Sequence, residues 1–158
     1  MNQQLNLDPK TQFKGIQILH LSLLLGSGLI FLMLWFANAP AINMGFSGGL
    51  FLYLTPTLAM AAIALSLFIY NKKKVEASKL NELNEKLAHY RQWNLARWAL
   101  TEWAALFSIL TFFFLENNII IALAAAFCLF VLAISRPTID GFVNDYQLTN
   151  AERAALER

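Results

Sequence analysis

The segment RWALTEWAALFSILTFFFLE (residues 97–116) decides the fold class, because it is apolar enough to cross a membrane although it holds an acid inside it. The hydrocarbon core of a bilayer is about 30 Å thick, so about 20 apolar residues of helix can cross it. A helix of a soluble bundle would carry a polar face, whereas here polar residues are only scattered. Segments of this kind occur at residues 15–36, 48–70, 95–115 and 118–135. We therefore predict an all-α, integral membrane four-helix bundle that forms a single domain.

The composition also indicates a membrane protein. Hydrophobic residues make up 58% of the chain and charged residues 14%, whereas a soluble domain is about 45–50% apolar and about 25% charged. Lys10 and Lys14, the apolar run after them and the small residues ANA (37–39) together resemble a signal peptide. Because this run is too long for the apolar region of a signal peptide, we expect it to be the first transmembrane helix.

The basic residues predict how the chain is oriented in the membrane. All 12 Lys and Arg residues lie before the first apolar segment, around residues 71–97, or after the fourth segment. Positive charges stay on the cytoplasmic side. We therefore expect a multi-pass protein of the bacterial inner (cytoplasmic) membrane, with both termini and the 71–94 segment in the cytoplasm. The Lys cluster abuts a helix end, where topology explains it, so we expect the lipid bilayer and no nucleic acid as a partner.

The cytoplasmic arm, residues 71–94, is predicted to be helical because it has good helix formers and neither Gly nor Pro. Leu80, Leu83, Leu87 and Tyr90 recur at a spacing of three to four residues, which gives one apolar face. The second and third transmembrane helices are therefore expected to extend into the cytoplasm and pack there. The arm is then a docking platform, a coiled-coil seam, or an interfacial helix on the lipid headgroups.

The cytoplasmic tail, residues 136–158, is expected to leave the membrane at Pro137, because a proline disfavours helix at the residue before it. Further on, Thr149 and Glu152 have the spacing of a capping box, in which each side chain bonds the backbone of the other. The sequence therefore predicts a short amphipathic C-terminal helix, which could lie on the membrane surface.

Glu102 is the first candidate functional residue, because a charged group deep in a bilayer costs a few kcal/mol and usually faces a bundle interior or a wet cavity. It lies roughly 10 Å inside the third segment, counted from Leu95 at about 1.5 Å per residue, and His20 lies at a similar depth in the first segment. A Glu102–His20 contact is therefore expected, as a proton or cation site or as a structural hydrogen bond. Arg97 is a further possible ion-pair partner of Glu102.

Small and hydroxylated residues recur at helical spacing and predict either close helix packing or a polar pore lining. Pro56 removes one backbone hydrogen bond from the second segment, so a kink or a gate is expected there. The packing or gating candidates are Ser22 and Gly26 in the first segment, Thr55 and Pro56 in the second, and Thr101 and Ser108 in the third.

The chain has no nucleophile–base pair, phosphate-binding loop, dinucleotide fingerprint or metal-ligand spacing, and Cys128 is its single cysteine. We therefore expect no enzyme activity, no catalytic residues, no cofactor and no metal site. Four spans are few for an alternating-access carrier, so transport would need an oligomer.

Residues 87–118 and 135–152 resemble an uncharacterised family of small four-span membrane proteins of Bacteroidota. The similar positions are Tyr-Arg at 90–91, Arg-Trp-Ala-Leu-x-Glu at 97–102, Ala-Leu-Phe at 105–107, Arg-Pro-Thr at 136–138, and the acidic tail at 144–152. This resemblance implies the four-span topology and an interest in Glu102, and it implies no catalytic role.

The shorter stretch ALTEWAALFSIL (99–110) is similar to the ion-carrying helix of rotary ATPase proteolipid (c-type) subunits, in which an intramembrane Glu binds the transported ion. The chain departs from that pattern in having only 7 glycines and in placing the acid in the third segment rather than the fourth. This resemblance implies ion transport through Glu102.

Two functions follow from these observations. The first is a non-enzymatic structural or accessory subunit of a homo-oligomer or of a larger membrane complex, which the small-residue helix faces and the arm favour. The second is a small proton or cation channel or transporter that uses Glu102 with His20. A helix contact filled by side chains would favour the first function, and a wet cavity beside Glu102 would favour the second.

Overall fold

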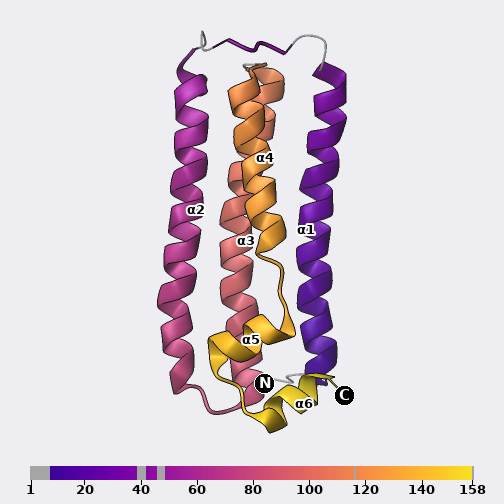
Figure 1. Cartoon of the computed structure of the whole chain (residues 1–158), viewed down its shortest axis with the longest axis vertical. Coiled ribbons are helices and arrows are strands. Elements are labelled where there is room, and N and C mark those ends of the chain that lie inside the picture. Colours follow the sequence, from indigo (N-terminus) through magenta and orange to yellow (C-terminus); the bar gives the residue numbers. More distant parts are fainter. Residues whose placement is uncertain (1–7, 39–41, 46–48, 116, 158) are drawn as a thin grey trace, which may run out of the picture.

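The structure is a computed structural model that describes residues 8–38, 42–45, 49–115 and 117–157 (Figure 1). The described chain is all-helical, which confirms the predicted all-α class. Its elements in chain order are α1 (Pro9–Asn38), α2 (Leu50–Glu76), a short 3-10 helix (Ala77–Lys79), α3 (Leu83–Phe114), α4 (Ile119–Ile134), α5 (Ile139–Tyr146) and α6 (Asn150–Glu157).

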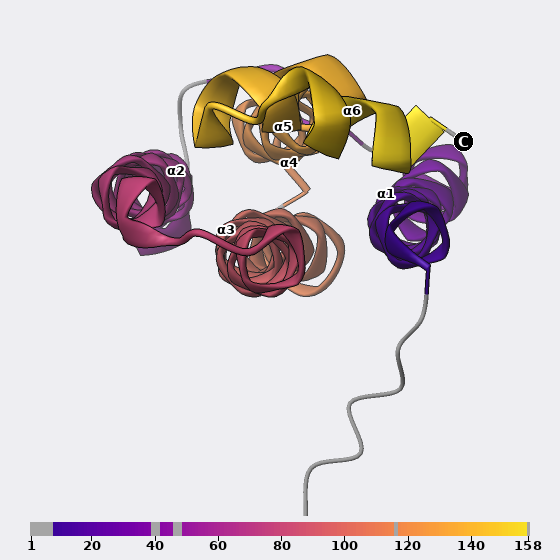
Figure 2. The same ribbon diagram turned by 90° about the horizontal axis from the view of Figure 1, so that it is seen from below.

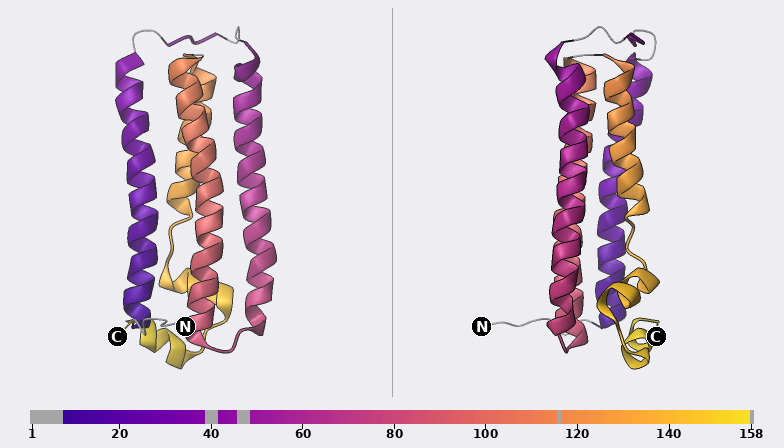
Figure 3. Two further views of the ribbon diagram at one scale, coloured as in Figure 1. Left: turned by 180° about the vertical axis from the view of Figure 1, so that it is seen from behind. Right: turned by 60° about the vertical axis from the view of Figure 1, so that its left-hand side comes forward.

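The two inner helices, α3 and α4, lie side by side, and α1 and α2 flank them on opposite sides (Figure 2). α2 packs against both inner helices, and α1 packs against both inner helices and α6. The beginning of α1, the turn between α2 and α3, and helix α6 all lie at the same end of the bundle (Figure 3). We call this end the lower end, as it is drawn in Figure 1.

The arm consists mainly of helix ends. α2 continues to Glu76, and α3 begins at Leu83, so only a short turn separates the two long helices. Pro56 lies in the second turn of α2, which continues past it as one helix to Glu76. A proline this close to the start of a helix removes only the bond to the residue four positions earlier, so most of the helix is unaffected.

α4 is much shorter than the other long helices because the sequence stops it at Ser135–Pro137. Its 16 residues end at Ile134, and the following residues lead to α5, whose axis is bent by 77° from that of α4. Thr138 starts α5 by accepting a hydrogen bond at Oγ1 from the Gly141 backbone N–H, at 3.1 Å. A Cβ at position 141 would lie 2.9 Å from the same Oγ1, so this cap needs a glycine there.

The tail packs on the helices rather than lying apart from them. Thr149 and Glu152 form the predicted capping box, because the Thr149 N–H donates to Glu152 Oε2 at 2.7 Å and the Glu152 N–H donates to Thr149 Oγ1 at 3.3 Å. Phe142, Tyr146 and Leu156 are buried in one apolar cluster at the lower end. The other buried members of this cluster are Phe13, Ile16, Ala77, Leu87, Tyr90, Trp98 and Leu132.

The upper end is tied together by backbone bonds between its two loops. The Asn43 N–H donates to the Asn117 carbonyl at 2.8 Å, and the Ile119 N–H donates to the Asn43 carbonyl at 3.0 Å. The buried Asn118 side chain donates to the Gly45 carbonyl at 2.9 Å and also caps α4. These bonds fix the beginning of α4 against the chain that leads into α2.

Two described helices are long and apolar enough to cross a membrane: Pro9–Ala37 with mean hydropathy 2.1, and Leu50–Glu76 with mean hydropathy 1.9. α4 and α5 meet the same requirement only together, as a bent pair. Large apolar side chains are exposed along the bundle, as at Leu29 (65%), Met33 (66%) and Phe36 (73%). Soluble monomers rarely expose extended apolar patches, so this surface agrees with a membrane protein.

Candidate functional site

Glu102 extends from α3 toward α1, where Ser27 is its hydrogen-bond partner. The Ser27 hydroxyl lies 2.9 Å from Glu102 Oε1 and 3.0 Å from the Leu23 carbonyl of its own helix. A hydroxyl has one hydrogen to donate, so it serves one of these two acceptors at a time. Ser27 is buried and Glu102 is partly exposed. Among the described residues the second carboxylate oxygen, Oε2, has no hydrogen-bond partner.

His20 does not contact Glu102, so the expected Glu102–His20 pair is wrong. The buried His20 donates from Nε2 to the Leu132 carbonyl at 2.9 Å, and its ring lies against the Trp98 ring with centroids 4.7 Å apart. The apolar segments that start at residues 15 and 95 begin at different heights in the bundle, so depth counted from those two residues was misleading. Glu102 is level with Ser27, which lies seven residues, or about 10 Å, further along α1 than His20.

His20 bonds the end of α4, where the helix breaks at residues 135–137; we call this the broken end of α4. The last carbonyls of a helix have no N–H partner within that helix. Here side chains from α1 and α3 supply donors in addition to Ser135, which bonds the Leu132 carbonyl. Trp98 donates from Nε1 to the Ser135 carbonyl at 3.2 Å, and Gln17 donates from Nε2 to the Pro137 carbonyl at 3.3 Å. Non-helical backbone at membrane depth is tolerated where it is buried in protein. The three donors therefore close the break instead of leaving its carbonyls open to a cation.

Arg97 faces away from Glu102, so the expected ion pair is also wrong. Five residues separate the two on α3, which turns them about 140° apart around the helix axis. The Arg97 guanidinium lies over the ring of Tyr70 on α2, 5.0 Å from its centroid, as a cation–π contact. Arg97 therefore belongs to the contact between α2 and α3.

The small-residue candidates divide into two groups. Thr55, Thr101 and Ser108 are buried between packed helices, as close packing predicts. Thr101 donates to the Arg97 carbonyl at 3.0 Å and Ser108 to the Ala104 carbonyl at 2.8 Å, whereas Thr55 Oγ1 has no partner among the described residues. These three residues are consistent with packing between the helices of one chain.

Ser22 and Gly26 do not mediate packing within the chain, which corrects that part of the prediction. Both lie on the exposed face of α1, where Ser22 donates to the Ile18 carbonyl at 2.9 Å. A Cβ built on Gly26 would meet nothing within 4 Å, so no helix approaches closely there. The face that does pack carries His20 and Ser27, whose spacing of seven residues could have revealed it.

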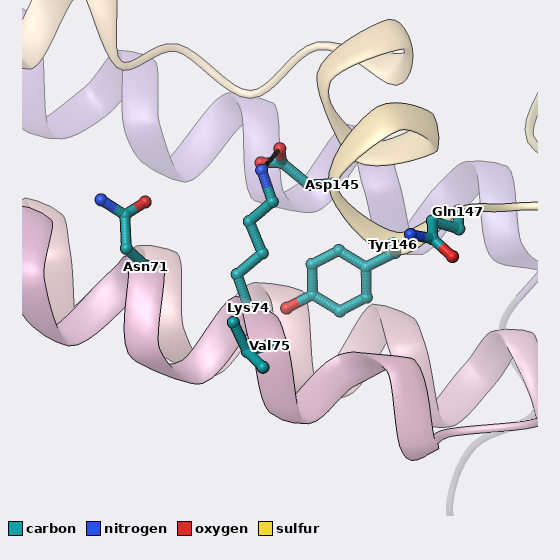
Figure 4. Close-up of a pocket in the computed structure, with 6 residues that line it drawn as sticks. All are labelled: Asn71, Lys74, Val75, Asp145, Tyr146 and Gln147. Carbon is teal, nitrogen blue, oxygen red and sulfur yellow. Dashed lines mark hydrogen bonds and ion pairs between the residues drawn. The ribbon is translucent and has the colours of Figure 1, made fainter.

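Asp145 anchors the tail to α2, which sequence reasoning did not predict. The Tyr70 hydroxyl donates to Asp145 Oδ2 at 2.7 Å, and Lys74 forms an ion pair with Oδ1 (Figure 4). Beside this pair is an open cavity of about 440 Å³. It is lined by Asn71, Lys74, Val75, Asp145, Tyr146 and Gln147.

His89 and Tyr146 form a second contact between the helices and the tail. The Tyr146 hydroxyl lies 2.8 Å from His89 Nδ1, and it is the donor when the imidazole is neutral. Burial lowers the pKa of His89, and the negative charge of Glu76 offsets this only in part. Burial raises the pKa of the Tyr146 hydroxyl, so this group keeps its hydrogen at neutral pH.

Lys86 and Glu152 form the third contact with the tail. Their charged atoms are 2.8 Å apart, and their side chains are only 10% and 16% exposed. Burial by itself would raise the pKa of Glu152, but the hydrogen bonds from Lys86 and Thr149 outweigh it and hold that pKa below its usual value. The tail is thus joined to α2 and α3 by three separate polar contacts.

The fold and these contacts define the class of the protein. It is an all-helical protein with two helices able to cross a membrane, in which polar side chains join one helix to another. No protein-family model, curated protein or solved structure matches the chain. The two family resemblances of the sequence therefore stay expectations.

Proposed function

We propose that the chain is a non-enzymatic, four-span protein of a bacterial inner membrane that serves as a structural or accessory subunit of an oligomer or larger membrane complex. α1 to α4 are the spans in this proposal, and the lower end is cytoplasmic. The Lys and Arg residues support this orientation, because those of the described chain belong to the parts of α1, α2, α3 and the tail toward the lower end.

The helix lengths are compatible with this placement. At 1.5 Å per residue, α1, α2 and α3, with 30, 27 and 32 residues, are roughly 40–48 Å long. They exceed a bilayer core of about 30 Å and would project on the lower side. α4, with 16 residues, is only about 24 Å long. Its break would therefore lie just inside the membrane, where the donors from Gln17, His20 and Trp98 are most needed.

The observation that carries the structural role is the hydrogen bond between Ser27 and Glu102. Acids within spans usually face a bundle interior, and polar side chains commonly bond across helices there. Here the carboxylate joins α1 to α3 through a serine that is itself buried. A helix contact filled by side chains favours a subunit whose polar groups hold helices together.

The second candidate function is a small proton or cation channel or transporter that uses Glu102. One specific observation favours it: Glu102 is partly exposed, and its Oε2 atom has no protein partner among the described residues. Water or an ion could therefore reach that oxygen in an oligomer. His20 contributes less than expected, because its Nε2 hydrogen is already bound to the Leu132 carbonyl.

Ion flux into liposomes separates the two functions. Purified wild type, Glu102→Gln and the matched control Glu85→Gln, which changes an exposed acid at the start of α3, are reconstituted and assayed over a pH series. The structural role predicts proton and cation flux no higher than in empty liposomes for all three proteins. Flux in the wild type and Glu85→Gln that disappears in a folded Glu102→Gln would establish the channel or transporter instead.

A further inference from the structure

An open groove lies between α1 and the residues that connect α4 to α5. Its volume is about 440 Å³, and it is lined on one side by Gln17, His20 and Leu21. The other side is formed by residues 136–139. The groove is distinct from the contact between Ser27 and Glu102, which lies higher on α1.

The groove carries positive charge that the described protein does not neutralise. Arg136 lines it, is exposed, and has no ion pair among the described residues. Lys14 is likewise exposed and unpaired within the described chain, and it lies one helical turn before Gln17 on the same face of α1. The acid nearest to Arg136 along the chain is Asp140, which already forms an ion pair with Arg153 at 3.0 Å.

The surface above the groove is apolar. Exposed side chains continue upward from it, with exposed fractions of 65% for Ile18, 52% for Leu21, 53% for Leu25 and 64% for Ile134. The ligand that fits has an anionic head for the two cations and hydrocarbon for this surface. A membrane lipid has both parts, whereas a free phosphate ion would leave the apolar surface uncovered.

We propose that this groove binds the phosphate headgroup of an anionic membrane lipid, with Arg136 and Lys14 as its cationic contacts. The proposal rests on the membrane placement proposed above, and it does not depend on what Glu102 does. The height is suitable, because the apolar segment of α1 begins at residue 15, so Lys14 and Gln17 lie at the membrane boundary. The amide of Gln17 donates to Pro137, which holds the two walls of the groove together.

The expected effect of each cation follows from membrane electrostatics. A Lys or Arg that contacts an anionic headgroup directly should give at least the preference of a cation close to an anionic surface, which is about fivefold for anionic over neutral lipid. Removing Arg136, which lines the groove, or Lys14, one helical turn below Gln17, should therefore lower the preference about fivefold. A charge lost elsewhere on the basic end should change it much less, because the lipid headgroup would not contact that residue.

Lipid retention by the purified protein tests the site. The full chain is equilibrated in mixed micelles that hold equal amounts of phosphatidylglycerol and phosphatidylcholine, and the lipids retained after washing are measured by mass spectrometry. The variants are Arg136→Gln, Lys14→Gln and the conservative Arg136→Lys. Lys72→Gln is the matched control, because Lys72 is exposed on α2, which lies on the opposite side of the bundle from α1.

The wild type is expected to enrich phosphatidylglycerol over phosphatidylcholine. This enrichment should fall about fivefold in Arg136→Gln and in Lys14→Gln. It should be mostly kept in Arg136→Lys and in Lys72→Gln. No enrichment in the wild type, or an equal loss in Lys72→Gln, would overturn the proposal. The bound lipid is also challenged with glycerol phosphate, inorganic phosphate or added phosphatidylglycerol. If either free phosphate compound displaces the bound lipid as effectively as added phosphatidylglycerol, the proposal is overturned in favour of a site for free phosphate. Sedimentation of every variant with the membrane fraction reports separately on the proposed membrane placement.

Discussion

Replacing Trp98 by Phe should destabilise the bundle because it removes the donor at the broken end of α4. The indole N–H is the only hydrogen-bond donor to the Ser135 carbonyl in the described chain, and Trp98 is fully buried. A buried carbonyl left without a donor costs about 1–3 kcal/mol, and the smaller ring leaves a cavity that costs about 1 kcal/mol more. We therefore expect Trp98→Phe to lower the free energy of unfolding by about 2–4 kcal/mol.

His20→Leu is expected to cost less, although His20 bonds the same broken end. The Leu132 carbonyl that it serves also accepts hydrogen bonds from the Ser135 backbone N–H at 3.2 Å and the Ser135 hydroxyl at 2.7 Å. Since that carbonyl keeps other donors, we expect His20→Leu to lower the free energy of unfolding by only about 0.5–1.5 kcal/mol. The two rings are in contact, so the effects of the two substitutions should not add in the double variant.

The assay is unfolding in mixed detergent micelles by titration with dodecyl sulfate, followed by circular dichroism. Trp103→Phe is the matched control, because that indole is 54% exposed and the substitution should change stability by less than about 0.5 kcal/mol. A loss of stability in Trp98→Phe that is no larger than in Trp103→Phe, or smaller than in His20→Leu, would show that the indole N–H does not stabilise the broken end of α4.

Three further predictions concern the other polar contacts. A double-mutant cycle of Ser27→Ala and Glu102→Leu should give a coupling energy of about 0.6 kcal/mol, and no more than about 1.7 kcal/mol; a coupling near zero would show that the contact does not hold α1 to α3. The folded pKa of His89 lies below its usual value of 6.5. Its contact with Tyr146 therefore stabilises the fold above pH 6.5, and this stability is lost as the pH falls below 6.5. The protection of the α5 amides against hydrogen exchange, taken relative to the intrinsic exchange rate at each pH, should therefore fall below pH 6.5 and fall less in His89→Asn; an equal fall in both proteins would contradict this. Because the folded pKa of Glu152 is likewise lowered, its ion pair with Lys86 contributes to folding stability above the usual pKa of 4.5 and loses this contribution as the pH falls below that value. At neutral pH, Glu152→Gln should therefore make α6 sensitive to protease, whereas the wild type resists.

Local features of the fold could be predicted because they depend on residues close together in the sequence. The long helices follow from continuous apolar runs, and the capping box of Thr149 and Glu152 spans only three residues. The break at Pro137 follows from the steric effect of proline on the residue before it. Helix α5 was missed, although Thr138 and Gly141 were a local signal for its start.

The partners across helices could not be predicted, because they depend on the relative heights and rotations of elements far apart in the chain. Gln17 and Pro137 are separated by 120 positions, and His20 and Leu132 by 112. The apolar segments that start at residues 15 and 95 lie about five residues apart in height, and this offset was enough to replace His20 by Ser27 as the partner of Glu102. The rotation of α3 likewise directed Arg97 toward α2.

Cysteine labelling in spheroplasts would show directly on which side of the membrane each end of the bundle lies. In a Cys128→Ser background, single cysteines replace Met44 in the upper loop, or Lys79 or Gln147 at the lower end, all of which lie outside the long helices' apolar segments. With the lower end in the cytoplasm, a membrane-impermeant maleimide should label position 44 in intact spheroplasts and label positions 79 and 147 only after lysis. Labelling of position 79 or 147 in intact spheroplasts, or a chain that stays soluble after lysis, would contradict this membrane placement.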